Sequence, residues 1–326
     1  MLKYFQHIRP SAIIALLIGT ALLRLPAYWF LESSSQPDSD IIGGFFNGLN
    51  SQPAVSMLLA FVFLFGQALI FNRICIEHDV LYAHSFLPAW MFVLCNSIFP
   101  EMLFINPVLV GNFLVLGALS RVLGLYRAQD GALVLFYTAA LFSLSSFFIV
   151  EYITAPILLI IFTIIFKNVK VRDLLAIVSG AMIPFIFLGA SALMFDQKIK
   201  LPSSGYKLAL PDLQGDILHF LAVIALLFLV FLGLAKTSIN YLKNNIQTRR
   251  VSLIFISFLV FTLLIIAVRF NLINYSFHIA APAISLFSGY FLLGNKGKNS
   301  KEFLHFILLA AIVISLYSPA LNKLLL

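Results

Sequence analysis

The feature that most limits how this chain can fold is a series of apolar runs, most of them close to 20 residues long, that follow one another from end to end. A run of that length matches a helix that crosses the hydrocarbon core of a bilayer. Hydrophobic residues make up 61% of the sequence and charged residues only 10%, whereas a soluble domain carries roughly 25% charged residues. The chain lacks the polar surface of a soluble enzyme, so we predict an all-α, polytopic transmembrane bundle in the form of one integral membrane domain.

We place about 11 spans along the 326 residues. The predicted spans are residues 11–31, 53–71, 83–99, 104–124, 131–150, 152–166, 174–195, 217–235, 251–269, 277–294 and 303–320. The stretch 131–166 is divided in two because a single helix would extend about 54 Å at 1.5 Å per residue. The hydrocarbon core is only about 30 Å thick, so we expect a tight outer hairpin at Glu151 and Tyr152.

The basic residues indicate the orientation of the bundle, since Lys and Arg concentrate in cytoplasmic loops. With a cytoplasmic N-terminus, 15 of the 21 basic residues fall on the inner side and six on the outer side. Treating 131–166 as one span would leave ten inside and eleven outside, and the bias would vanish. We therefore predict that the protein crosses the membrane with its N-terminus inside and its C-terminus outside. The net charge of +8 reflects this orientation, and we expect the lipid bilayer, not nucleic acid, as the partner.

Two outer loops, residues 32–52 and 196–216, are longer than the other connections. Long ordered loops often hold function. In the first loop the apolar residues of 41–49 fall on one helical face, which predicts a short helix lying in the membrane interface. In the second loop Lys198 and Lys200 stand among turn-forming residues. This second loop is either a solvated connection or a lid that offers lysine to a phosphate-bearing substrate.

Acidic residues on the outer side are candidates for chemistry. Asp38 and Asp40 form a D-x-D pair, and carboxylate oxygens are ligands that Mg²⁺ and Mn²⁺ prefer. The same pair can also cap a helix or form a turn without any metal. Glu101 and Glu151 lie at outer hairpins near membrane depth, where carboxylates are costly and often functional. Hairpin tips also reach headgroup water, so a solvated role stays open for both.

Arg24 and Arg269 lie at or just inside the outer ends of their spans, against the positive-inside trend. Each can pair with an outer carboxylate, contact a lipid phosphate or extend its side chain to the interface. His278, close to the outer end of a later span, completes the candidate substrate-binding set. The two cysteines, Cys75 and Cys95, fit small apolar side chains within helices better than a disulfide.

The segment from Arg24 to Arg73 resembles the opening of the GT-C superfamily of polytopic glycosyltransferases. The matching residues are Arg24-Leu25-Pro26, Asp38-Ser39-Asp40, the amphipathic 41–49, and Gln52-Pro53 leading to Asn72-Arg73. The stretch from Phe99-Pro100-Glu101 through Arg121 resembles the second outer loop and the span that follows it. The resemblance divides the chain into a GT-C-like portion of about 1–216 and additional spans over about 217–326.

What this resemblance implies is an enzyme that uses a polyprenyl-phosphate-linked sugar at the outer face. Asp38 or Asp40 would then be the catalytic base or a ligand of a divalent cation such as Mg²⁺ or Mn²⁺, and Glu101 a second acidic residue of the site. The whole chain also resembles uncharacterised bacterial inner-membrane families, from which no activity follows. The alternative is a non-catalytic protein: a transporter, a flippase-like carrier, or an integral subunit of an envelope assembly with membrane-protein partners.

Overall fold

The computed structural model describes residues 2–6, 10–30, 43–50, 52–81, 83–128, 130–194, 217–268, 273–293 and 298–325. Within these ranges the chain forms helices joined by turns, and no β-strand is present. The predicted all-α class is therefore confirmed.

The helices follow in the order α1 (Leu2–Phe5), α2 (Pro10–Phe30), α3 (Gly43–Asn50), α4 (Pro53–Glu77), α5 (Leu87–Cys95), η1 (Pro100–Leu103), α6 (Pro107–Leu123), η2 (Gly124–Arg127), α7 (Gly131–Ser145), η3 (Val150–Thr154), α8 (Ala155–Phe166), α9 (Val171–Met194), α10 (Ile217–Asn240), η4 (Tyr241–Lys243), α11 (Ile246–Val268), α12 (Ile273–Leu292) and α13 (Lys298–Leu325). Each predicted span overlaps one of these α-helices, and the stretch 131–166 divides at η3, where the hairpin was expected. The predicted interfacial helix corresponds to α3.

Six segments are long and apolar enough, by length and composition alone, to cross a bilayer. They are Pro53–Glu77, Pro107–Arg127, Val171–Met194, His219–Asn240, Ile246–Ala267 and Asn299–Tyr317. Several such segments in one chain are what a multi-pass membrane protein requires. The predicted span at 83–99 contains only the nine-residue α5. A helix of that length rises about 14 Å, so α5 is too short to cross the hydrocarbon core alone.

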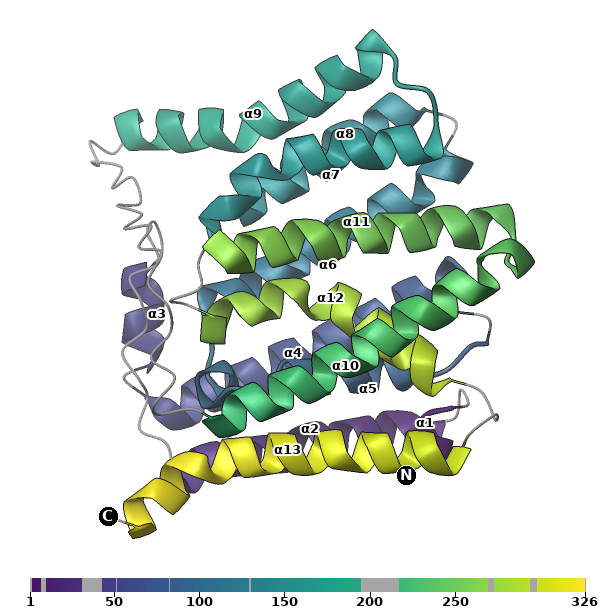
Figure 1. Ribbon diagram of the computed structural model, residues 1–326. Helices are drawn as coiled ribbons and strands as arrows, with labels where there is room; N and C mark the ends of the chain where they lie inside the picture. Colours follow the sequence, from purple (N-terminus) through teal and green to yellow (C-terminus); the bar gives the residue numbers. More distant parts are fainter. Residues whose placement is uncertain are drawn as a thin grey trace.

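The long helices run roughly parallel or antiparallel to one another, as Figure 1 shows. In this view α9 lies at the top edge of the bundle, and α2 and α13 lie at the bottom edge. The centre is α12, which packs against α5, α6, α10 and α11. Every side chain from Phe277 to Tyr290 on α12 is buried. α1 lies at one end of the bundle, whereas the last turns of α13 lie at the opposite end (Figure 1).

Two glycines allow helix backbones to approach each other closely. A Cβ atom added at Gly180 of α9 would come under 3.0 Å from the carbonyl oxygen of Phe136 in α7. One added at Gly233 of α10 would come equally close to the carbonyl oxygen of Phe287 in α12. Small residues at helix contacts are a main source of packing energy in lipid, where the hydrophobic effect does not drive helices together. These two contacts therefore hold α9 and α10 at their observed distances from their neighbours.

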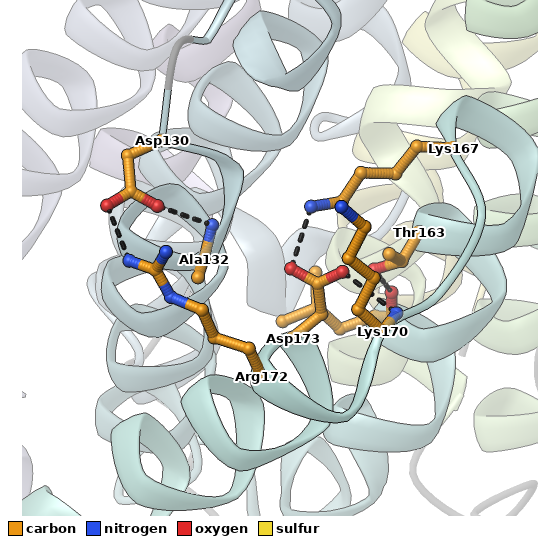
Figure 2. Close-up of polar contacts among 8 residues, drawn as sticks. Asp130, Ala132, Thr163, Lys167, Lys170, Arg172 and Asp173 are labelled. Atoms are coloured by element: carbon orange, nitrogen blue, oxygen red, sulfur yellow. Dashed lines mark hydrogen bonds and ion pairs between the residues drawn. The ribbon is translucent and has the colours of Figure 1, made fainter.

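One end of the bundle gathers basic side chains, and we call it the basic end. Figure 2 shows how ion pairs join the starts of α7 and α9 there. Asp130 accepts from the backbone nitrogen of Ala132 at 3.2 Å and pairs with Arg172 at 2.8 Å. Asp173, which is buried, pairs with the Nζ atom of Lys167 at 2.7 Å. These contacts fix the turn between α8 and α9.

Other residues predicted on the inner side also meet at the basic end. Arg250 donates to the carbonyl oxygen of Phe166 at 2.9 Å, and Lys236 donates to that of Leu293 at 2.7 Å, so cations cover the last turns of α8 and α12. Burial lowers the pKa of His78, which follows α4 at the same end. The sequence thus predicted correctly that Arg250, Lys236 and His78 lie at the same end of the bundle.

Candidate functional site

The opposite end of the bundle, which we call the η1 end, is organised around the short helix η1. The chain leaves α5, forms η1 and enters α6 through an extended segment at Phe104 to Asn106. η1 contacts α2, α4 and α12. Pro100 starts this turn, and two of its other residues, Met102 and Leu103, are fully buried. The η1 helix therefore lies where three helices, α2, α4 and α12, come together.

Arg24 reaches η1 from α2. Its side chain is only 2% exposed, and its Nη1 atom donates a hydrogen bond to the carbonyl oxygen of Leu103. The Nε and Nη2 atoms are also buried, and neither has a hydrogen-bond partner among the residues that the structure describes. A buried guanidinium with unused donors is costly unless an anion compensates its charge. Arg24 is therefore the strongest anion-binding candidate within the described ranges.

Glu101 lies in the first turn of η1, two residues before the carbonyl that Arg24 contacts. Its side chain is half-buried. The structure thus brings two residues that the sequence singled out, Arg24 and Glu101, to the same short segment, although 77 positions separate them in the chain. A cation and a carboxylate at one helix end can bind a phosphate and accept a proton, respectively.

His278, the third predicted residue at this end, belongs to a buried network of amides. Its Nδ1 atom contacts Asn96 Oδ1, its Nε2 atom lies 3.2 Å from Asn106 Nδ2, and its carbonyl oxygen accepts from Asn112 Nδ2 at 2.8 Å. Since the Asn106 amide nitrogen can only donate, Nε2 accepts and the ring is neutral with its proton on Nδ1. His278 thus ties α12 to α6 and to the residue that follows α5.

Asn106 and Asn96 each have a second role in this network. Asn106 Oδ1 accepts from the backbone nitrogen of Leu109 at 2.7 Å and so caps the start of α6. Asn96 Nδ2 donates to the carbonyl oxygen of Phe92 at 2.7 Å, at the end of α5. Neither asparagine stands out in the sequence as a site residue. Their residue type was the available signal, because an asparagine side chain buried in an apolar run needs a hydrogen-bond partner.

Glu151 lies on a second short helix, η3. The η3 helix packs against α7 and α8, and Glu151 is only 8% exposed there. Its neighbour Tyr152 packs against the rings of Phe142 and Phe261. The remaining predicted residues, Asp38, Asp40, Lys198, Lys200 and Arg269, lie outside the described residues. The D-x-D pair and the lysine-bearing loop therefore stay predictions.

The described residues contain no group of three or more His, Cys, Asp or Glu side chains arranged to hold a metal ion. Cys75 and Cys95 are both buried and free, as their surroundings in the sequence predicted. Comparisons with protein-family models, with curated proteins and with solved structures find no match to this chain.

Proposed function

We propose that this chain is a GT-C-like glycosyltransferase of the bacterial inner membrane, with about eleven spans and an N-in, C-out topology. In this proposal the η1 end faces outward and binds a polyprenyl-phosphate-linked sugar. The gathering of Lys167, Arg172, Arg250 and other cations at the basic end supports the orientation, because basic residues favour the cytoplasmic side.

The observation that carries the proposal is the buried guanidinium of Arg24. Two of its nitrogens have no hydrogen-bond partner in the described part of the chain, and a guanidinium fork matches the oxygens of a phosphate. In our proposal these nitrogens bind the phosphate of the lipid-linked sugar. The lipid tail would then extend from the η1 end into the surrounding bilayer.

Glu101 is proposed as the general base. Its carboxylate accepts the proton of an acceptor hydroxyl while the hydroxyl oxygen forms a bond to the anomeric carbon of the sugar. The bond from that carbon to the phosphate oxygen breaks, and its electron pair remains on the phosphate, where Arg24 stabilises the added charge. Mg²⁺ or Mn²⁺, if used, would be held by Asp38 and Asp40.

We expect Glu101→Gln in proteoliposomes supplied with a polyprenyl-phosphate-linked sugar to lower transfer by roughly 10²- to 10⁴-fold, the usual contribution of a general base. Asp40→Asn should also abolish transfer. Glu77→Gln is the matched control, since Glu77 is an exposed carboxylate next to the basic end, and it should leave transfer unchanged. The measurement is the rate of sugar transfer for protein of equal thermal stability.

Two outcomes would count against this proposal. Transfer by Glu101→Gln at the wild-type rate would remove Glu101 from the mechanism. Wild-type protein that binds the lipid-linked sugar without transferring it would favour the non-catalytic alternative, a flippase-like carrier.

A further inference from the structure

A groove of about 700 Å³ lies between α7, α9 and the last turn of α6. Its lining includes Arg121, Tyr137, Leu144, Pro184, Phe187 and Ser191. Apart from Arg121, the hydroxyl of Tyr137 and that of Ser191, the side chains that line it are apolar. We call this feature the α7–α9 groove.

The groove opens on the outside of the bundle. It lies along α9, which forms one edge of the helix array (Figure 1). Only 17% of the most apolar stretch of α9 is buried, and Phe187 is 72% exposed. Such a surface on a membrane helix contacts lipid chains or another membrane protein.

Two of the three polar residues of the groove, Arg121 and Tyr137, lie toward the basic end, whereas Ser191 lies in the last turn of α9. Arg121 lies in the last turn of α6, and its guanidinium carbon is 5.7 Å from the ring centroid of Tyr137. Tyr137 follows the start of α7 by six residues, which places it about 9 Å along the helix. Arg121 is exposed, and no ion pair involves it among the described residues. A cation at this depth on a lipid-facing surface requires an anion or water.

We propose that the α7–α9 groove binds one anionic phospholipid of the inner leaflet. Its phosphate contacts Arg121 and the hydroxyl of Tyr137, and one acyl chain lies along α7 and α9 toward Phe147. From Tyr137 to the end of α7 at Ser145 is eight residues, or about 12 Å of helix, and Phe147 follows just beyond, which suits an acyl chain. A second copy of this chain is a poorer occupant, because an apolar helix in the groove would cover Arg121 without neutralising its charge.

The proposal can be tested by titrating delipidated, detergent-solubilised protein with single phospholipids and counting bound molecules by native mass spectrometry. We expect wild-type protein to bind one phosphatidylglycerol roughly tenfold more tightly than phosphatidylcholine, since a free cation favours the lipid with net negative charge. Arg121→Gln should remove this preference, and Arg121→Lys should keep most of it. Ala140→Trp, which fills the groove, should weaken binding of both lipids.

Arg73→Gln is the matched control, since Arg73 is an exposed arginine of α4 outside the groove and lies 3.8 Å from Glu77. It should bind phosphatidylglycerol like the wild type. Equal affinity of wild-type protein and Arg121→Gln for phosphatidylglycerol would overturn the proposal. Wild-type dimers that exclude lipid and dissociate in Ala140→Trp would also overturn it, because a second copy would then occupy the groove.

Discussion

Gly180→Leu should destabilise the protein by about 3 kcal/mol, at the upper end of the usual cost of overpacking a core. The added side chain would meet the backbone carbonyl of Phe136, which cannot turn aside as the tip of a flexible side chain can. α9 would have to move away from α7 and lose packing along their contact. Gly233→Leu should behave in the same way, because the carbonyl of Phe287 stands in the path of its side chain.

Gly189→Leu is the control for Gly180→Leu, because it adds the same side chain to the same helix. Among the described residues, no atom apart from the backbone of α9 itself lies within 4 Å of a Cβ added at Gly189, and leucine is a better helix former than glycine by up to about 1 kcal/mol. The midpoint of thermal unfolding in detergent should therefore fall for Gly180→Leu and stay the same or rise for Gly189→Leu. Equal midpoints for the two variants would show that α9 does not pack on α7 as described.

His278→Leu is expected to have the second largest effect on stability. The substitution leaves Asn96 Oδ1 and Asn106 Nδ2 without the ring nitrogens that they contact, and both asparagines have no exposed surface. Each unsatisfied buried group costs about 1–3 kcal/mol, so a loss of about 3 kcal/mol is expected. The measurement is again the thermal unfolding midpoint.

His84→Leu serves as the control for His278→Leu. The His84 side chain is 54% exposed and lies 3.8 Å from Asp79, and surface changes of this kind usually stay within about 0.5 kcal/mol. A His278→Leu variant as stable as His84→Leu would mean that the ring does not hold α12 to α6. Its role as a substrate ligand would then become the stronger interpretation.

The positions of the helices could be predicted from the sequence because the thickness of a bilayer sets the length of the apolar run that crosses it. The sequence divided 131–166 correctly because two physical limits, bilayer thickness and the bias of basic residues, agreed. It did not predict that α5 has only nine residues. Hydropathy registers the Asn96-Ser97 pair as a brief polar interruption, whereas the Ser97 hydroxyl donates to the carbonyl oxygen of Val93 at 2.8 Å and helps to end the helix.

The site was predictable only in part. Arg24 and Glu101 stood out because charges near membrane depth are rare. The amide network was not predictable, because its contacts join residues that are far apart in the chain: Asn96 and His278 are separated by 182 positions. Hydrophobic periodicity carries no information about such pairs, which depend on how α12 is placed between α5 and α6.

In the proposed topology the η1 end, with Arg24 and Glu101, faces the outside of the cell. Side-specific labelling of single cysteines tests this orientation. The background is Cys75→Ala, Cys95→Ala, which removes two buried thiols. Single cysteines are then introduced at two exposed positions. Gly48→Cys in α3 marks the η1 end (Figure 1), and His84→Cys, near Asp79, marks the basic end. A membrane-impermeant maleimide should label Gly48→Cys in intact spheroplasts and His84→Cys only after lysis. Labelling of His84→Cys in intact spheroplasts, with Gly48→Cys protected, would reverse the orientation and contradict the account.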